Sequence, residues 1–364
     1  KNIFLKEFHR SNGAKFVPFA GYEMPINYKN GIINEHLHVR KKVGIFDVSH
    51  MGQILIPANQ INISALEVYI PLNLQKIPLN KCHYSFILNQ KGGIIDDVMF
   101  SKLIINNQEN FYIVYNASRK NILDQIFNEI CNNCNIIKNR CLIAIQGPSA
   151  YSSLKSIINI TSKMRFLDIK VIKYKESDLY VSRSGYTGED GFEISIPNEN
   201  IESLIDQIFN NENIILCGLG CRDSLRVEAG LSLYGNEINE DITPIQAGLS
   251  WALDKNRLDD NKLNGGNLLL QELKATKKTK KIGITPINKT MLRNNMTLHN
   301  EQKEEIGYIT SGCFSPILKK SIGIGYVDNF SKNLDKIYVK VRGNFEKVNI
   351  NKIPFVKKNY KKGD

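Results

Sequence analysis

The feature that most constrains the fold is a change in the residue pattern near residue 282. Before it, apolar residues occur with both strand-like and helix-like spacing, which is typical of mixed α/β structure. After it, short alternating runs are separated by turn residues, which favours a small β-barrel or sandwich. Four such runs are "KIGITPI", "EEIGYITSG", "KSIGIGYV" and "KIYVKVRG". We therefore predict an α+β chain whose last domain, over 282–364, is a β domain.

The chain has 364 residues, which is too long for one hydrophobic core, so two or three domains are expected. The mixed α/β part gives two regions, 1–141 and 142–275, because a second series of strand and helix patterns follows residue 141. The lysine-rich stretch "KATKKTKK", at 274–281, is expected to link the second region to the β domain.

Composition excludes several classes of protein. Hydrophobic residues make up 42% and charged residues 23%, as in a soluble globular protein, and no apolar run approaches the ~18 residues that cross a bilayer. We therefore expect no membrane segment, and the charged opening "KNIFLKEFHR" predicts no secretory signal. The net charge of +12 suits anionic partners. Nucleic-acid binding is not expected, because the lysines and arginines are not interleaved with aromatic residues.

The seven cysteines are scattered and odd in number, which indicates reduced thiols in a reducing compartment. Cys131 and Cys134, in "CNNC", have the spacing of metal ligands. A structural zinc site usually needs four ligands, and no second matching pair follows. We therefore predict no metal site.

"GGIIDDVMF", residues 92–100, places two adjacent acids in a run that otherwise has the pattern of a buried strand after a hairpin turn. Successive strand residues face opposite sides, so either Asp96 or Asp97 is expected to be partly buried. Burial would raise the pKa of that carboxyl unless donors or a cation stabilise its charge. The pattern predicts a functional acid without choosing between the two. The alternative is that both stay hydrated near the turn.

"SGYTGEDGFEISIP", residues 184–197, contains glycines that permit a tight turn, followed by a strand pattern. On this strand Glu193 alternates with apolar residues. Glu193 is therefore either a solvated strand residue or a planar acceptor for paired N–H donors.

"GCRDSLRVEAGLSLYGNEI", residues 220–238, predicts a helix that ends near Gly230. Arg222 and Arg226 lie four residues apart, on one face of this helix. A surface helix stabilised by ion pairs is the simpler interpretation, although the helix dipole disfavours an arginine near the start.

Other catalytic signatures are absent. The sequence contains no G-x-S-x-G motif, no phosphate-binding G-x-x-x-x-G-K-S/T loop and no H-E-x-x-H motif. His50, in "DVSHMG", is expected to be a structural histidine whose hydrogen bonds are satisfied within the protein.

Together these stretches resemble the glycine cleavage T-protein family of aminomethyltransferases. The resemblance covers nearly the whole chain, and "GYTGEDGFE" followed by "RDSLRVEAGL" is its most specific part. It implies a three-domain cloverleaf with two mixed α/β domains, whose chain paths interleave, and a C-terminal antiparallel β-barrel. The other matching stretches, in chain order, are "FAGYEMPINY", "FDVSHMG", "GGIIDDVM", "VYNA", "AIQGP", "TPIQAGLSW", "GYITSGCFSPILKKSIGIGYV" and "IPFVKKNY".

The resemblance implies transfer of one carbon to tetrahydrofolate. In the family, a lipoylated H protein carries an aminomethyl group. The T protein moves its methylene carbon onto the folate, releases ammonia and gives 5,10-methylenetetrahydrofolate. Tetrahydrofolate is then a substrate and the H protein a transient partner, and no metal, nucleic acid or membrane is involved. The implied compartment is the cytoplasm of a bacterium or the mitochondrial matrix of a eukaryote.

The resemblance also implies site residues. Asp97 matches the family's catalytic aspartate, which leaves Asp96 a secondary role. Glu193 matches the residue that grips the pterin, and Arg222 matches a second substrate contact. Residues that match the lining of the folate cavity, or a contact made by the chain's tail, are Met51, Tyr84, Asn116, Tyr234, Trp251 and Tyr360.

Two alternatives use the same fold. One is a folate-dependent demethylase that acts on a small methylated compound, although the intact "GYTGEDG" and "SLYGNEI" favour a T protein. The other is a non-catalytic folate-binding protein of the kind linked to iron–sulfur cluster maintenance. The reactive cysteine motif of those proteins, K-G-C-Y-x-G-Q-E, is missing from this chain.

Overall fold

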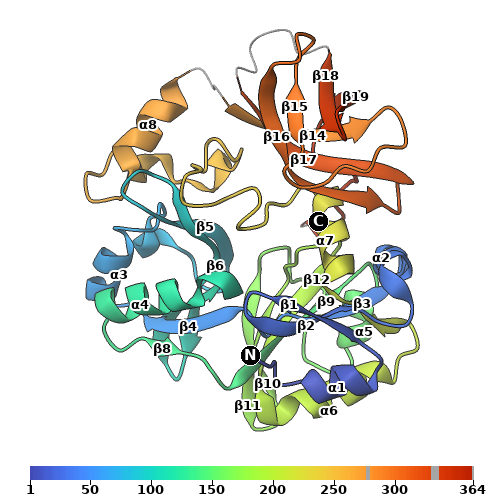
Figure 1. Ribbon diagram of the computed structural model, residues 1–364. Coiled ribbons are helices and arrows are strands. Elements are labelled where there is room, and N and C mark those ends of the chain that lie inside the picture. The colour runs from blue at the N-terminus through green and yellow to red at the C-terminus, as the bar shows by residue number, and fades with distance from the viewer. Residues whose placement is uncertain (276–278, 329–335, 363–364) are drawn as a thin grey trace.

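The computed structural model describes residues 1–275, 279–328 and 336–362, which form three lobes around a common centre (Figure 1). Two lobes are mixed α/β structures and the third is a closed antiparallel barrel at the C-terminal end, so the predicted cloverleaf is confirmed. Part of the predicted lysine-rich linker, 276–278, and the last two residues of the basic tail, 363–364, lie outside the described residues.

The first lobe contains a five-stranded antiparallel sheet in the order β5-β6-β7-β4-β8. Its core joins the sheet to two helices, because Phe100 and Phe111 of the strands share a buried cluster with Leu66 of α3 and Phe127 of α4. The predicted hairpin of the acidic stretch is formed by β5 and β6. The elements are β4 (Gly52–Pro57), α3 (Gln60–Leu66), η1 (Leu74–Lys76), β5 (Cys82–Leu88), β6 (Ile94–Ile105), β7 (Gln108–Tyr115), η2 (Ala117–Arg119), α4 (Lys120–Ile130) and β8 (Asn135–Ile136).

The second lobe contains a six-stranded sheet in the order β10-β11-β12-β9-β3-β13. Here β3, from the beginning of the chain, pairs antiparallel with β9 and parallel with β13, so distant segments interleave in one sheet. The elements are α1 (Lys6–Ser11), β1 (Lys15–Phe19), β2 (Tyr22–Asn27), α2 (Gly31–Lys41), β3 (Val43–Asp47), β9 (Arg140–Gln146), α5 (Ala150–Leu154), β10 (Ile169–Tyr174), β11 (Ser177–Ser182), β12 (Gly191–Pro197), α6 (Asn198–Phe209) and β13 (Ile214–Leu216).

The segment after α7 (Leu219–Glu228) returns to the first lobe. Its residues Ile238, Leu249 and Leu269 form a buried cluster with Phe86 and Ile94 of the β5–β6 hairpin. This return path carries Tyr234 and Trp251 to the β5–β6 hairpin, whose strand β6 bears the acid pair. The short helices on the path are η3 (Ser250–Ala252), η4 (Lys255–Arg257) and α8 (Gly266–Lys274).

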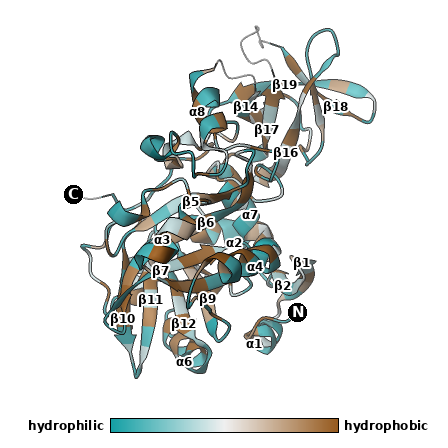
Figure 2. Ribbon diagram, turned by 90° about the vertical axis from the view of Figure 1, so that its left-hand side faces the viewer, coloured by the Kyte–Doolittle hydropathy of each residue, from teal (hydrophilic) through white to brown (hydrophobic). Residues whose placement is uncertain are grey.

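The third lobe is a closed barrel in the order β14-β17-β16-β15-β18-β19. Figure 2 shows hydrophobic residues concentrated in the strands of the sheets, as expected when one face of each strand lies against a core. Among the described residues, no helix combines the length and the apolar character needed to cross a membrane. The strands are β14 (Thr279–Pro286), β15 (Thr297–His299), β16 (Glu305–Ser315), β17 (Lys320–Asp328), β18 (Ile337–Val341) and β19 (Asn344–Asn351).

Helix α7 lies between the lobes, and the prediction of a surface ion-pair helix is wrong. Arg226 and Glu228 are buried, with 1% and 0% of their surfaces exposed. Arg226 forms an ion pair of 2.7 Å with Glu237 and donates to Ser311 of the barrel, while Glu228 accepts from Ser315 at 2.5 Å. The charged side chains of α7 therefore join the barrel to the rest of the molecule.

Candidate functional site

The acid pair on β6 is held by donors from two neighbouring strands. Asp96 is fully buried and Asp97 is partly exposed, because they point to opposite sides of the sheet. The side-chain amide of Asn116, just after β7, donates to one oxygen of each acid, at 2.7 and 2.6 Å. The hydroxyl of Tyr84, on β5, donates to the other oxygen of Asp97 at 2.9 Å. One amide thus bridges the two carboxyls.

Burial raises the pKa of both carboxyls above the ordinary value for aspartate. The charge of Asp97 raises the pKa of Asp96 further, because two neighbouring negative charges repel each other strongly in a buried setting. The hydrogen bonds from Tyr84 and Asn116 lower the pKa of Asp97 and oppose the effect of burial. The side-chain amide and backbone N–H of Asn116 lower the pKa of Asp96 as well, so hydrogen bonds oppose the effect of burial at both acids.

Two aromatic side chains from the return segment lie beside this pair. Trp251 stacks on Tyr84, with ring centroids 5.7 Å apart and an interplanar angle of 23°. Trp251 keeps 68% of its surface exposed, so much of its aromatic surface is open beside Tyr84, the donor to Asp97. The ring of Tyr234 lies 5.1 Å from the guanidinium carbon of Arg119, and burial raises the pKa of Tyr234 to about 12.

Glu193 and Arg222 come from the second lobe and from α7. Glu193, on β12, accepts a hydrogen bond of 2.5 Å from the hydroxyl of Ser184. Burial lowers the pKa of Arg222, and the negative charge of Glu193 opposes that shift, so the two side chains interact electrostatically. Among the described residues, the buried Nη1 atom of Arg222 has no hydrogen-bond partner.

Tyr186 contacts Arg222 and is also influenced by the charge of Asp97, although the sequence prediction did not include it. Its ring centroid lies 4.8 Å from the guanidinium carbon of Arg222, and its hydroxyl donates to the backbone oxygen of Ser232 at 2.5 Å. Burial raises the pKa of Tyr186, and the charge of Asp97 contributes to that rise. The only available signal was its place inside the glycine-rich turn "SGYTGEDG".

The C-terminal tail returns to the same region. Tyr360 stacks on Phe166 with centroids 4.0 Å apart and an interplanar angle of 4°. Burial raises the pKa of Tyr360 to about 12, and the charge of Glu193 is among the causes. The backbone N–H of Asn359 donates to Gly188, in the turn before β12, at 2.8 Å. The tail therefore lies against the turn that precedes Glu193.

Met51 and His50 lie at the junction of β3 and β4. Met51 is partly buried against the cluster that contains Phe46 and Leu225. His50 is 3% exposed, and its Nδ1 atom has no hydrogen-bond partner within the described part of the chain. The expectation of a satisfied structural histidine is therefore wrong for this nitrogen.

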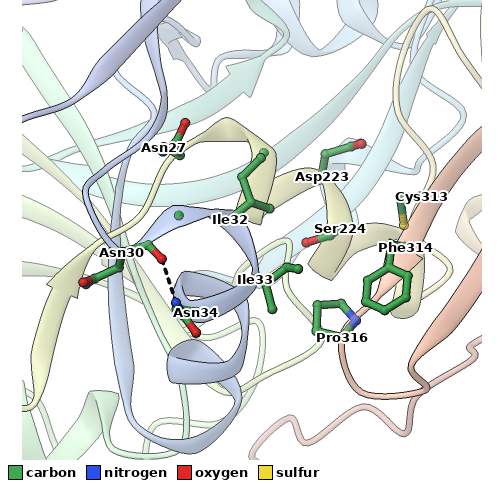
Figure 3. Close-up of a pocket in the computed structure, with 12 residues that line it drawn as sticks. Asn27, Asn30, Ile32, Ile33, Asn34, Asp223, Ser224, Cys313, Phe314 and Pro316 are labelled. Carbon is green, nitrogen blue, oxygen red and sulfur yellow. Dashed lines mark hydrogen bonds between the residues drawn. The ribbon is translucent and has the colours of Figure 1, made fainter.

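Two other features lie apart from these residues. A hollow of about 750 Å³ lies between α2, α7 and the end of β16 (Figure 3); Asp223 and Ser224 line it, but none of the predicted site residues does. Elsewhere, Glu35, Cys217 and Cys221 bring three possible metal-ligand atoms within 4.8 Å of one another. Both oxygens of Glu35 already accept backbone N–H groups, from Tyr28 and from Gly218 at the start of α7. Glu35 thus has a structural role at this helix end.

Comparisons with known families show which family the chain belongs to. A family model described as the GCVT N-terminal domain matches residues 5–257, and one described as the glycine cleavage T-protein C-terminal barrel domain matches residues 280–357. The chain belongs to the glycine cleavage T-protein family. The family resemblance seen in the sequence is therefore confirmed.

Individual T-protein relatives match over more than nine-tenths of their length. The chain is 39% identical to a protein named "Aminomethyltransferase, mitochondrial" from Dictyostelium discoideum, covering 100% of this chain and 94% of that protein. It is 36% identical to the protein of the same name from Flaveria trinervia, covering 100% and 91%. The crystal structure of glycine cleavage system aminomethyltransferase T from Bartonella henselae superimposes with a TM-score of 0.91 at 32% identity, covering 100% of this chain and 99% of that one.

Proposed function

We propose that this chain is the aminomethyltransferase of a glycine cleavage system and that Asp97 is its catalytic acid group. Family membership over the full length supports the activity. The observation that carries the assignment of Asp97 is its geometry. It is the acid that stays partly exposed, it is held by Tyr84 and Asn116, and an open aromatic face lies beside it.

The proposed reaction uses two substrates. The H protein carries an aminomethyl group on one sulfur of its dihydrolipoyl arm, and tetrahydrofolate supplies two N–H groups. The carbon–sulfur and carbon–nitrogen bonds of the aminomethyl group break, and two carbon–nitrogen bonds to the folate form. Of the two protons that the folate loses, one completes the thiol and the other completes ammonia. No oxidant or reductant is needed for this balance.

Asp97 has a defined part in this scheme. Nitrogen atoms that attack an electrophilic carbon become positively charged before they lose their protons. A fixed carboxylate next to them stabilises that charge and orients the nitrogens for attack. Tyr84 and Asn116 each occupy one oxygen of Asp97, which restricts its rotation and leaves the remaining lone pairs for the folate.

Glu193 and Arg222 are proposed to hold the folate. A pterin presents adjacent N–H groups, which match the two oxygens of a carboxylate, and Arg222 offers a buried donor without a partner among the described residues. The exposed face of Trp251 suits a flat aromatic ring. We propose that the other contacts predicted from the family, Met51, Asn116, Tyr234 and Tyr360, complete the surface around the ligand.

The partner and compartment are also proposals. The net charge of +12 suits an acidic lipoyl carrier, because opposite charge accelerates encounter. Curated relatives from Dictyostelium discoideum, Flaveria trinervia and Mus musculus are named as mitochondrial, which favours the mitochondrial matrix if the source is a eukaryote.

The test is turnover with purified substrates. Aminomethylated H protein and tetrahydrofolate should give methylenetetrahydrofolate and ammonia in equal amounts. Replacing the H protein by small methylated amines should give no product; turnover of those amines instead would point to a demethylase. Folate binding without transfer from either donor would favour a non-catalytic binding protein.

A further inference from the structure

Two buried nitrogens, one on the proposed folate contact Arg222 and one on its neighbour His50, have no hydrogen-bond partner among the residues that the structure describes. They are Nδ1 of His50 and Nη1 of Arg222. Leaving a buried polar group unpaired costs about 1–3 kcal/mol, so native proteins rarely do so without a reason. Arg222 already has a proposed partner in the folate, but His50 has no assigned role.

The position of the His50 ring is fixed by packing. The rings of Phe19 and Tyr22 lie edge-on to it, with centroids 5.6 and 6.4 Å away. The ammonium group of Lys120 lies 3.4 Å from the backbone oxygen of His50 and 3.1 Å from the hydroxyl of Tyr22. None of these contacts uses Nδ1. The ring is therefore held in place while Nδ1 has no hydrogen-bond partner in the described part of the chain.

The charge state of His50 follows from its neighbours. Burial is the main cause that lowers its pKa, to about 3, and the positive charges of Arg222 and Lys120 lower it further. Asp47 opposes this shift, but its carboxylate is engaged by His9 at 2.8 Å. The imidazole is thus neutral at physiological pH, with one nitrogen that donates and one that accepts.

We propose that His50 is a further substrate-binding residue, whose neutral imidazole contacts tetrahydrofolate directly through Nδ1, beside Arg222. The proposal rests on the proposed function, because the ligand is the folate of that reaction. A pterin carries donors and acceptors side by side, so it can satisfy a neutral imidazole next to a guanidinium, whereas a plain anion would use the guanidinium alone. His50 precedes Met51, another proposed contact, so both residues would reach the ligand from the turn before β4.

The first test measures the Kd for tetrahydrofolate in a matched series. His50→Ala should weaken binding about tenfold, since about 1.4 kcal/mol of lost interaction corresponds to that factor. His50→Asn places an amide near the position of Nδ1 and should stay within about threefold of the wild type. His50→Gln places its amide near Nε2 and should behave like His50→Ala. In turnover, KM for folate should rise in the weakened variants while kcat at saturating folate changes little.

The second test separates contact from a structural role. In protein labelled with ¹⁵N-histidine, the Nδ1 resonance of His50 should move when tetrahydrofolate is added to the full chain. An unmoved resonance, together with variants that lose thermal stability but bind folate as the wild type does, would overturn the proposal. If the wild-type chain itself fails to bind folate, the proposed function fails, and the role of His50 falls with it.

Discussion

At the residue scale, the acid pair shows what a local pattern can and cannot predict. The alternation of the strand predicted that one of two adjacent acids would be buried, and Asp96 is that residue. The donors that distinguish them could not be predicted locally, because Tyr84 and Asn116 lie 13 and 19 residues from Asp97 and reach it only across the sheet. The prediction for His50 was wrong for the same reason. Whether its ring nitrogens find hydrogen-bond partners depends on residues that are distant in the sequence, and among the described residues Nδ1 finds none.

Asp97→Asn tests the chemistry at this scale. The amide keeps the shape but cannot stabilise developing positive charge, so kcat should fall about 10²- to 10³-fold, within the usual range for such groups. The Kd for tetrahydrofolate should stay within about threefold, because in the proposed site Glu193 and Arg222 supply the binding. Asp206→Asn, at an exposed position on α6, is the matched control and should leave both values unchanged. Near-normal turnover of Asp97→Asn would show that Asp97 is not the catalytic residue.

Tyr84→Phe tests the electrostatics of the same carboxyl. The Tyr84 hydroxyl lowers the pKa of Asp97, so its removal should let that pKa rise. If the reaction needs ionised Asp97, the acidic limb of the kcat/KM profile should move to higher pH, and activity should be lost earlier as the pH falls. A pH–rate profile from pH 4 to 9 checks this. A limb that stays in place, or moves to lower pH, contradicts the account.

At the element scale, α7 shows how a helix can be predicted correctly and placed wrongly. Its end near Gly230 follows from the sequence, and Gly230 has φ +67°, a conformation that favours glycine. Its charges suggested a solvated surface, because their partners lie far along the chain. Glu237 pairs with Arg226 while also accepting from the hydroxyls of Thr310 and Ser311.

Breaking this buried pair should destabilise the molecule strongly. Arg226→Met leaves Glu237 buried without its cation, which should cost about 3–5 kcal/mol in the free energy of unfolding. The double variant with Glu237→Gln should recover part of that loss. Urea denaturation measures both. Arg10→Met, which removes an exposed pair with Glu7, should cost no more than about 1 kcal/mol. An equally small loss for Arg226→Met would show that the pair contributes little.

At the scale of the whole molecule, the sequence predicted the barrel and the mixed character of the other lobes, because each depends on local periodicity. It could not derive the pairing of β3 with β13, which joins residues 43–45 to 214–216. The family resemblance, not the pattern of residues, implied that interleaving. The same limit applies to the site, whose parts come from both α/β lobes, α7 and the tail.

The charge of the whole molecule predicts how the partner binds. With a net charge of +12, association with an acidic H protein should weaken as salt screens the attraction. KM for the H protein should rise several-fold between about 50 and 300 mM salt, where the Debye length falls well below about 14 Å. Small-molecule folate binding serves as the internal reference and should change less. A KM for the H protein that is independent of salt would contradict an electrostatic docking step.

The most direct measurement is a crystal structure of the full chain with a tetrahydrofolate analogue bound. We expect one ligand to contact all three side chains, with its reactive nitrogens at Asp97 and its pterin at Glu193 and Arg222. A ligand bound in the hollow lined by Asp223 and Ser224, or one that leaves Asp97 untouched, would contradict it.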